Sequence, residues 1–405
     1  MPTLLQINST ANSASTGRIA EQIGILVMAE GWKSYIAFGR SANQSQSHII
    51  KIGNKWSVKV HGFNSLLFDN HGLSSSTATK QLVGTIKGIS PDIIHLHNIH
   101  GYYINYRVLF DFLSTLDVPV VWTLHDCWPF TGHCSYYSDV DCQKWQIRCE
   151  NCAKIHNYPK SFFVDRSERN YRIKKECFNA VSNLTLVPVS HWLENEVNKS
   201  FLSKHQVRCI LNGVDIEQFR PYENLDEIRS EYGLNGKRVL LGVATAWGPR
   251  KGWDDYIRLS GMLPSDYHIV MVGVTEKQAK KLPSSILAIP RTESIEKLAQ
   301  LYSLADVVLN LSDEESFGLT TAEGFACGTP SIVYNCTASP ELITPETGFV
   351  LDKGDLNGVI KALQTITTRG KQCYSEKCRE RAVTLYDKNI NYSQYIELYK
   401  ELLNL

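Results

Sequence analysis

The chain has 405 residues, of which 43% are hydrophobic, and a formal net charge of +1. A chain of this length can bury two hydrophobic cores, and the usual domain size predicts two to three domains. The near-zero charge argues against bulk nucleic-acid binding, which normally shows a basic face or domain. Residues 1–8 lack the basic start of a secretory signal, and no apolar run approaches the ~18 residues of a membrane span. We therefore expect a cytoplasmic protein.

The first half of the chain alternates strand-like and helix-like segments. An apolar run at 3–8 is followed by a polar loop through Gly17 and by apolar residues at helical spacing from Ile19 to Val27. This alternation predicts a parallel sheet covered by helices. Further strand-like runs lie at 34–38, 92–97, 118–124 and 184–189.

The second half repeats the alternation. The spacing of apolar residues at 295–304 is helical, and the chain beyond Leu356 is expected to be helical, with a last helix at 392–403. The fold class is therefore α/β, with two Rossmann-like, doubly wound parallel sheets. The strand-like runs of this half lie at 237–244, 267–273, 306–311 and 330–334.

The boundary between the two predicted domains falls within residues 190–230. There, Asn212-Gly-Val-Asp215 predicts a turn and Phe219-Arg-Pro221 a non-helical exit. The predicted parts of the chain are a first domain at 1–205 with a cysteine-rich insert at about 127–160, a second domain at 206–385, and a C-terminal helix at 386–405.

The segment from Glu315 to Pro330 carries the strongest functional signal. It places the carboxylates of Glu315 and Glu323 around a turn and a small-residue helix, between two β-prone runs. The turn, Phe317-Gly-Leu319, follows a strand's carboxyl end, where open α/β sheets bind ligands and helix-start amides attract phosphate. A carboxylate accepts hydrogen bonds from the vicinal hydroxyls of a sugar or ribose. The alternative is a charged loop and a helix-start Glu that complements the helix dipole.

Arg250 and Lys251 form a second chemical landmark. They follow the strand-like run at 237–244, so both can face a diphosphate at the carboxyl edge of the sheet. Arg would bind the diphosphate bidentately and Lys as a point charge, and together they would stabilise the negative charge that grows on a leaving phosphate. The alternative is a solvated basic pair.

The first half offers its own candidates. His125 comes at the carboxyl end of the run 118–124 and is a candidate to contact a ligand; the alternative is a structural histidine whose tautomer Asp126 fixes. Gly17 lies in a loop where a small residue lets a ligand approach the backbone; the alternative is a turn that requires positive φ. Candidates for the side that binds a second substrate are His95, His97, Asn98 and His100.

The chain has eleven cysteines, which without a secretory signal are expected to be thiols or metal ligands. Four of them are spaced C-x7-C-x6-C-x2-C: Cys134, Cys142, Cys149 and Cys152. Thiolates at these spacings can bind tetrahedral zinc and staple a loop that is poor in apolar residues; free thiols are the alternative. Five aromatic residues could pack around this insert, which is the expected role, or offer faces that stack on a sugar: Trp128, Phe130, Tyr136, Tyr137 and Trp145.

Several of these patterns resemble one known family. Glu315-x7-Glu323 followed by Gly-Thr-Pro330 resembles the signature of the retaining, nucleotide-sugar-dependent glycosyltransferases of family four, which have the two-domain GT-B fold. Thr123 through Gly132, running into the cysteine-rich insert, resembles a bacterial exopolysaccharide subgroup of colanic-acid-type transferases. The resemblance covers nearly the whole chain. It departs from the family at Trp247-Gly-Pro-Arg250, which replaces the commoner Gly-Arg pair.

The resemblance implies two Rossmann-like domains that face an interdomain cleft, with the terminal helix crossing back onto the first domain. His125 and Glu315 would contact the donor sugar, the basic pair would hold the diphosphate, and Glu323 would bind the ribose. The residues that it assigns to catalysis are His125, Arg250, Lys251 and Glu315. Those that it assigns to donor binding are Gly17, Phe317, Gly318, Leu319 and Glu323.

The implied reaction is the retaining transfer of a sugar from a nucleotide-diphosphate sugar, with UDP and GDP the expected nucleotides. The acceptor would be a saccharide or an undecaprenyl-diphosphate-linked precursor of a bacterial surface polysaccharide, which would bring the protein to the inner membrane as a peripheral partner. No residue is an obvious nucleophile, so we expect front-face transfer in which the leaving phosphate takes the acceptor's proton. No Asp-x-Asp pair in a metal-dependent context stands out, so no catalytic metal is expected.

Two alternatives stay open. One is a nucleotide-sugar 2-epimerase of the same fold, which would use the donor site without an acceptor; the Glu-x7-Glu signature and the cysteine-rich insert speak against it. The other is a non-catalytic scaffold in which a zinc cluster is the working part. Such a scaffold would not need Lys251, Glu315 and Glu323 together.

Overall fold

The computed structural model describes all 405 residues, and the chain divides into two compact units. Unit 1 comprises residues 1–210 together with 392–405, and unit 2 comprises residues 211–391. These limits lie a few residues after the expected ones at 205 and 385. None of the helices has the length and apolar character needed to cross a membrane.

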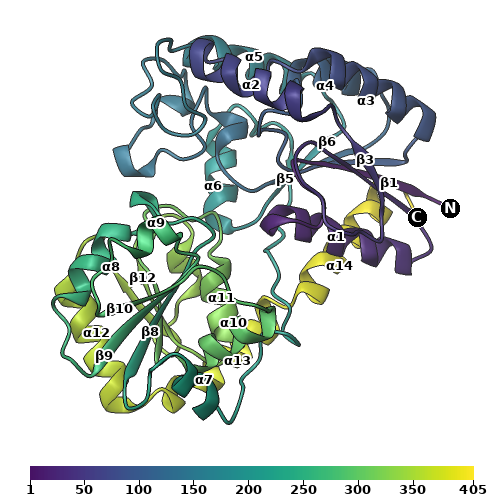
Figure 1. Cartoon of the computed structure of the whole chain (residues 1–405). Coiled ribbons are helices and arrows are strands. Elements are labelled where there is room, and N and C mark those ends of the chain that lie inside the picture. The colour runs from purple at the N-terminus through teal and green to yellow at the C-terminus, as the bar shows by residue number, and fades with distance from the viewer. The chain divides into compact units, whose positions relative to one another are not determined.

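Unit 1 is built on a seven-stranded sheet with the strand order β3-β2-β1-β4-β5-β6-β7, and its strands pair in parallel (Figure 1). The strands are β1 (Thr3–Asn8), β2 (Lys33–Phe38), β3 (His48–Lys51), β4 (Ile93–Leu96), β5 (Val120–Leu124), β6 (Leu184–Pro188) and β7 (Gln206–Val207). The helices are α1 (Ala14–Ala29), α2 (Lys55–Phe68), α3 (Ser76–Ile89), α4 (Tyr106–Leu113), α5 (Ser167–Asn179), α6 (His191–Lys199) and α14 (Lys388–Leu402), which enters unit 1 at Tyr392. Three short 3-10 helices follow β5: η1 (Trp128–Phe130), η2 (Ser138–Val140) and η3 (Lys144–Gln146).

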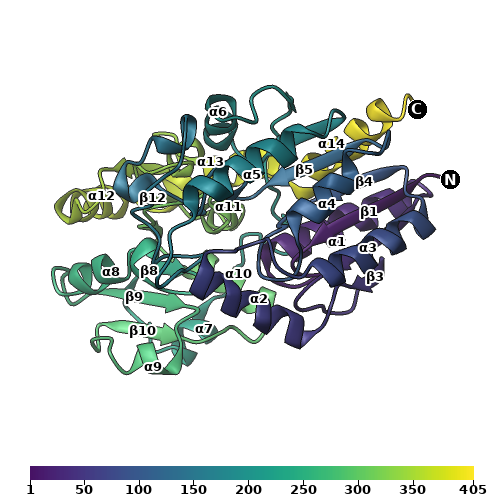
Figure 2. The same cartoon turned by 90° about the horizontal axis from the view of Figure 1, so that it is seen from above.

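Unit 2 has a six-stranded parallel sheet with the order β10-β9-β8-β11-β12-β13, and helices lie on both of its faces (Figures 1 and 2). The strands are β8 (Arg238–Val243), β9 (Tyr267–Val272), β10 (Ile286–Ile289), β11 (Val307–Asn310), β12 (Ser331–Tyr334) and β13 (Gly348–Leu351). The helices are α7 (Asp226–Glu231), α8 (Trp253–Ser260), α9 (Glu276–Ala279), α10 (Ile295–Leu304), α11 (Leu319–Ala326), α12 (Leu356–Arg369) and α13 (Gln372–Leu385). Two 3-10 helices complete it: η4 (Pro249–Lys251) and η5 (Ser339–Leu342).

The central strands are apolar because the sheets are covered on both faces. Every residue of β1, β4, β5 and β6 is buried, and so is every residue of β11 and β12. A parallel strand of this kind reads as a continuous apolar run, which is why the sequence predicted it. The edge strand β3 is largely exposed, so its sequence carried no such signal.

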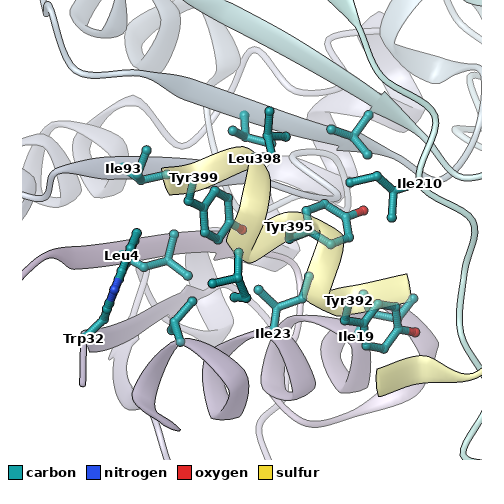
Figure 3. Close-up of a cluster of buried hydrophobic side chains, with 14 residues drawn as sticks. Leu4, Ile19, Ile23, Trp32, Ile93, Ile210, Tyr392, Tyr395, Leu398 and Tyr399 are labelled. Atoms are coloured by element: carbon teal, nitrogen blue, oxygen red, sulfur yellow. The ribbon is translucent and has the colours of Figure 1, made fainter. Parts of the chain in front are cut away.

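The last helix, α14, packs onto the sheet of unit 1 (Figure 3). Tyr395 and Tyr399 are buried in a cluster that includes Leu4 and Trp32. The Tyr399 hydroxyl bonds to His95 Nδ1 at 2.6 Å, and the Tyr395 hydroxyl lies 2.9 Å from Thr123 Oγ1. The helical stretch expected beyond Leu356 is in fact three helices, because Gly370 adopts a φ of 85° and ends the first of them.

Both sheets reverse their direction of winding at one point. In unit 1 the chain builds β1 to β3 toward one edge and then β4 to β7 toward the other, so that β1 and β4 are neighbours. In unit 2 the same reversal makes β8 and β11 neighbours. The loops that follow two such strands diverge and leave room for a ligand at the carboxyl edge of the sheet. Each unit therefore has one position where its topology favours ligand binding.

Candidate functional site

In unit 2, the two loops at the reversal point are joined side by side. The loop after β8 contains Arg250 and Lys251, and the loop after β11 runs from Leu311 to Gly318. The amide of Asp313 donates to the carbonyl oxygen of Arg250 at 2.9 Å, and the Arg250 guanidinium donates to the carbonyl oxygen of Glu314 at 2.8 Å. The basic pair and the acidic turn, which are far apart in sequence, are therefore one structural element.

Gly252 lets the two loops approach. Its φ is +73°, and a Cβ atom built on it would lie 2.2 Å from the carbonyl oxygen of Leu311. A backbone oxygen cannot move aside as a flexible side chain can, and the left-handed conformation also disfavours residues with a Cβ. The sequence Lys251-Gly252 is thus explained by backbone geometry as well as by charge.

Lys251 and Glu315 form an ion pair at the centre of this element. The Lys251 ammonium donates to Glu315 Oε1, and both side chains are largely buried. Burial works to raise the pKa of the Glu315 carboxyl, but the charge and hydrogen bond of Lys251, together with Arg250, outweigh it and hold the pKa below its usual value. Glu315 therefore stays ionised, and the pair presents a cation and an anion at one spot.

The backbone of Glu315 is fixed from a third loop. Thr337 Oγ1 accepts from the Glu315 amide and donates to its carbonyl oxygen, both at 2.8 Å. Thr337 follows β12, the next strand of the sheet. The position of the Glu315 carboxylate is thus set by both its side-chain and main-chain partners.

The helix α11 begins directly after this turn. Gly318 caps it in the left-handed conformation, with a φ of 102°. The first amides of an α-helix have no intrahelical acceptor, so they point toward the space beside the turn and favour an anion there. Phe317 is buried and its ring lies 5.6 Å from that of Tyr386, so its side chain packs in the core of unit 2.

Glu323 lies one turn into α11. Its Oε2 accepts a hydrogen bond of 2.7 Å from the hydroxyl of Tyr302, a buried residue of α10. The burial of Tyr302 and its contact with Glu323 raise the pKa of the Tyr302 hydroxyl well above its usual value, so it acts as a donor. Sequence reasoning found Glu323 but not Tyr302, because nothing near Tyr302 in sequence marks its partner.

The turn in which the sequence departs from the family, Trp247 to Arg250, closes over the end of the sheet. The Trp247 indole N–H donates to the carbonyl oxygen of Val272 at 2.9 Å, and its ring lies 4.9 Å from that of Tyr256. Tyr256 in turn donates to the carbonyl oxygen of Leu309. These bonds tie the ends of β8, β9 and β11 together, so Trp247 supports the loop that carries Arg250.

Unit 1 has a pocket of about 530 Å³ at its own reversal point. The pocket is polar, with hydroxyls, an amide and one cation, Arg40, among its lining groups. Its lining residues are Ser9, Thr10, Ala14, Ser15, Thr16, Arg40, Ser41 and Asn98. The pocket combines Arg40 with the first turn of α1, and both features favour an anionic group.

Asn8 and Gly17 contact residues that line this pocket. The Asn8 carboxamide, at the end of β1, donates to the carbonyl oxygen of Thr10 at 2.9 Å and accepts from the Asn98 amide at 3.3 Å. Gly17 lies inside α1, so its expected place in a loop was wrong, and so was the alternative of a turn that requires positive φ. A Cβ on Gly17 would meet Thr10 Oγ1 at 2.5 Å, which means that Gly17 makes room for the loop; a contact between Gly17 and a ligand stays a prediction.

His97 and His125 lie together at the carboxyl edge of the same sheet. His125 Nε2 is 3.3 Å from His97 Nδ1, and His97 Nε2 is 3.0 Å from Gln6 Oε1. Burial, more than any charged neighbour, lowers the pKa of His125 to about 4 and that of His97 well below its usual value. Both rings are therefore neutral near pH 7, and His125 can offer a hydrogen bond but no positive charge.

Two expectations for this region need correction. The carboxylate of Asp126 contacts His100 Nε2 at 3.0 Å and accepts from the Trp128 amide at 2.9 Å, so it anchors the following insert; the structure gives no support for its orienting His125. His95 is fully buried between Thr123 and Tyr399, so it fastens the last helix to the sheet and does not line the pocket. Of the four residues named for a second substrate, only Asn98 lines the pocket.

Of the four cysteines named for zinc, Cys134 and Cys149 are buried. The thiols of Cys134 and Cys152 are hydrogen-bonded to each other, and the Gly132 amide donates to Cys149 Sγ at 3.2 Å. Trp128, Phe130, Tyr137 and Trp145 are buried, which confirms packing for these four, whereas Tyr136 is half-buried. Zinc at the four cysteines stays a prediction. The group whose ligand atoms all lie within 4.8 Å of one another is not these cysteines but His191, Glu194 and Cys209.

The structure therefore unites Arg250, Lys251, Glu315 and the start of α11, and places Glu323 in the same helix. It places His125 and Gly17 in unit 1. Sequence reasoning missed Arg40, which follows β2 in an ordinary loop and becomes notable only beside the pocket.

Comparisons with known proteins agree with this division. Residues 28–218 match the model of Glycosyltransferase Family 4, and residues 224–382 match the model of Glycosyl transferases group 1. A putative colanic acid biosynthesis glycosyl transferase WcaC of Escherichia coli is 24% identical over 57% of this chain and 59% of its own length. A 41.2 kDa protein from the cps region of Klebsiella pneumoniae is 22% identical over 88% of this chain and 93% of its own length.

Solved structures show the same architecture. Sucrose-phosphate synthase from Thermosynechococcus elongatus aligns with a TM-score of 0.73 at 17% identity and covers both chains completely. HepE of Anabaena in complex with UDP-glucose aligns with a TM-score of 0.67 at 14% identity, over 98% of this chain and 99% of that chain. The fold is the two-domain fold of these proteins, with a parallel Rossmann-like sheet in each unit.

Proposed function

Because the chain belongs to the glycosyltransferases described by these two family models, we propose that it transfers a sugar, with retention of configuration, from a nucleotide-diphosphate sugar to a saccharide or lipid-linked acceptor. The relatives named for colanic acid synthesis and for a cps region suggest a bacterial surface polysaccharide as the product. The complex of HepE with UDP-glucose supports UDP as a nucleotide to test first, with GDP next.

The observation that carries this proposal is the Lys251–Glu315 pair at the β8–β11 reversal point. The diphosphate would lie against the Lys251 ammonium and the first amides of α11, with Arg250 as a second cation. Glu315, kept ionised by its neighbours, would accept hydrogen bonds from the hydroxyls of the donor sugar. Glu323, held by Tyr302, would accept those of the ribose.

Such a site would promote departure of the nucleoside diphosphate by electrostatics. Negative charge grows on the leaving phosphate as the bond to the sugar breaks, and preorganised cations and amides stabilise that charge. The acceptor hydroxyl would attack on the same face of the sugar, and its proton would pass to the leaving phosphate oxygen. The protein would need no covalent intermediate. Neutral His125 would contribute a hydrogen bond to the sugar.

We assign the acceptor side to the pocket of unit 1. Arg40 and the first turn of α1 would attract an anionic group, such as the diphosphate of a lipid-linked acceptor, and the hydroxyls of Ser9, Thr10 and Thr16 suit a saccharide. A lipid-linked acceptor would place the protein at the cytoplasmic face of a membrane.

A structural zinc ion at Cys134, Cys142, Cys149 and Cys152 is a second part of the proposal. The observation that supports it is the bond from the Gly132 amide to Cys149 Sγ, because a bond of this kind would stabilise the charge of a metal-bound thiolate. The ion would hold an insert that is built from short 3-10 helices.

A direct test measures nucleoside diphosphate release from a panel of UDP-, GDP- and ADP-sugars, with and without a lipid-linked oligosaccharide acceptor and with EDTA as a control. We expect release from one donor, stimulated by acceptor and insensitive to EDTA, and a product whose anomeric configuration equals the donor's. Release without any transferred sugar, together with conversion of the donor at C2, would instead identify an epimerase. No release and no thermal stabilisation by any nucleotide would point to a scaffold.

A further inference from the structure

The helix α2 presents its apolar side chains to solvent. Trp56, Val60 and Phe63 are spaced along one face of the helix, and they are 74%, 56% and 59% exposed. The residues of α2 that are buried are polar, His61 and Ser65. This is the reverse of the usual arrangement, in which the apolar stripe of a surface helix faces the core. Figures 1 and 2 show α2 at the surface of unit 1.

The orientation of α2 is fixed by its polar side. His61 Nε2 accepts from the Gly72 amide at 3.0 Å, and its Nδ1 lies 2.9 Å from Ser75 Oγ. Burial lowers the pKa of His61 to about 4, so the ring keeps these bonds as a neutral group near pH 7. Rotating the helix to bury Trp56 and Phe63 would break both bonds. The exposed apolar face is therefore built into the fold.

Two further aromatic residues adjoin this helix. The Phe162 amide donates to the carbonyl oxygen of Leu66 at 2.8 Å, which ties this segment to the last turn of α2. Phe162 is 47% exposed and Phe163 is 81% exposed. We call these residues and the exposed face of α2 the α2 surface, which comprises Lys55, Trp56, Lys59, Val60, Phe63, Lys160, Phe162 and Phe163.

The charge exposed by residues 31–91, the stretch that contains α2, has one sign. Residues 31–91 contain seven basic residues, all exposed, and a single acidic residue, Asp69. Asp69 is fully buried and bonds to His133 Nδ1 at 2.7 Å, so no carboxylate of this stretch reaches the surface. The basic residues are Lys33, Arg40, Lys51, Lys55, Lys59, Lys80 and Lys87. Although the chain as a whole is nearly neutral, this part of unit 1 is cationic.

The cations and the aromatic rings are in contact with each other. The Lys59 ammonium lies 5.1 Å from the centroid of the Trp56 ring, and that of Lys160 lies 4.6 Å from the centroid of the Phe162 ring. Exposed Trp and Phe next to Lys is the combination that inserts at the boundary between lipid headgroups and acyl chains, where the ring is buried and the ammonium meets phosphate. An apolar protein partner would not require the one-sided charge.

We propose that the α2 surface docks this protein onto a bilayer that contains anionic phospholipid. Trp56, Phe63 and the Phe162–Phe163 pair enter the headgroup region, and Lys55, Lys59 and Lys160 bind lipid phosphates. Docking would bring the enzyme to a lipid-linked acceptor, and this purpose rests on the proposed function. Docking itself needs neither donor nor acceptor.

The test is flotation of the full chain with vesicles of phosphatidylcholine alone or mixed with phosphatidylglycerol. We compare the wild type with Trp56→Ser/Phe63→Ser, with Lys55→Gln/Lys59→Gln, and with a control pair in unit 2, Met262→Ser/Lys361→Gln. We expect the wild type and the control to float with anionic vesicles and to be released by salt. Each α2 pair should lower the bound fraction at least tenfold at equal lipid concentration.

A second readout reports on Trp56 itself. Brominated acyl chains should quench part of the tryptophan fluorescence of the wild type, and Trp56→Ser should remove that part. Failure of the wild type to bind anionic vesicles, or equal binding by the α2 variants, would overturn the proposal. Loss of self-association in the Trp56→Ser/Phe63→Ser variant without any lipid binding would assign the surface to a second copy of the chain. Donor turnover with a water-soluble acceptor is measured in parallel, so that failure of the transferase proposal is recognised separately.

Discussion

The two units have the same kind of sheet but different chemistry at the point where the winding reverses. In unit 2, Arg250 and Lys251 hydrogen-bond the loop after β8 to the loop after β11, and the site contains the buried Lys251–Glu315 ion pair. In unit 1, the corresponding loops enclose an open polar pocket, and the nearby histidines are neutral. The comparison teaches that topology selects the place for a ligand, whereas the side chains on the two loops select its charge.

The largest effect is expected from removal of the Lys251 cation of unit 2. Lys251→Ala is expected to lower kcat about 100- to 1000-fold, because the charge on the leaving phosphate loses its nearest point charge. Lys361→Ala, an exposed lysine of α12, is the matched control. Steady-state kinetics with the identified donor measures both. Near-normal kcat in Lys251→Ala would show that the ion pair is only structural.

The cysteine-rich insert belongs to unit 1 alone, so its disruption should lower the stability of unit 1 and leave that of unit 2 unchanged. Addition of a zinc chelator, or Cys149→Ser, is expected to destabilise unit 1 by about 3 kcal/mol, because a metal bound at the proposed site would contribute to folding. At temperatures at which unit 1 is still folded, the variant should bind nucleotide in unit 2 as the wild type does. Metal analysis and calorimetric melting provide the measurement. Purified protein without zinc and with a melting curve insensitive to chelator would leave the cysteines as free thiols.

The close approach of the two loops in unit 2 can be tested at Gly252. Gly252→Ala is expected to cost about 2–3 kcal/mol, because the new Cβ meets the Leu311 carbonyl oxygen in a left-handed conformation. Gly261→Ala has ordinary space and an ordinary φ and should be nearly neutral. Denaturant unfolding compares them. Equal stability of the two variants would mean that the loops are not held together as described.

Acid should affect unit 1 before unit 2. His61 and His125 have pKa values lowered to about 4, so the unfolded state binds more protons than the folded state as pH falls below the usual histidine value. The free energy of unfolding therefore decreases as pH falls below about 6.5, and each of these histidines lowers it by about 2 kcal/mol at pH 5. Glu315 affects stability only at lower pH, because the stability that its lowered pKa contributes is lost only below the usual pKa of a glutamate. Hydrogen exchange at pH 7 and pH 5 should show faster exchange in 92–126 than in 237–260; the opposite order would contradict the assignment.

The smallest effect is expected at Glu323. Glu323→Gln keeps an oxygen to accept from Tyr302 but weakens the acceptor for ribose hydroxyls, so the donor KM should rise about tenfold, or about 1.4 kcal/mol, with kcat less affected. Donor kinetics checks this value. A change in kcat alone would move Glu323 from donor binding to the reacting groups.

Sequence reasoning predicted the central strands because strands buried on both faces read as apolar runs. It identified Glu315, Glu323, Arg250 and Lys251 from a family resemblance and from their places after such strands. It did not predict the Lys251–Glu315 bond, because register between two distant loops is a tertiary property. The placement of Gly17 in a loop was wrong, since the residue is helical and makes room for Thr10. Arg40 and His61 were missed because each depends on neighbours brought together only by folding.

The central claim is that the loops after β8 and β11 bind a nucleoside diphosphate. Titration calorimetry of the wild type, Lys251→Ala, Glu323→Gln and Lys361→Ala with UDP, GDP and ADP tests it without any knowledge of the acceptor. We expect one nucleotide to bind the wild type and the Lys361→Ala control equally, and to bind both site variants at least tenfold more weakly. Unchanged affinity in Lys251→Ala and Glu323→Gln would contradict the account and place the nucleotide elsewhere in the chain.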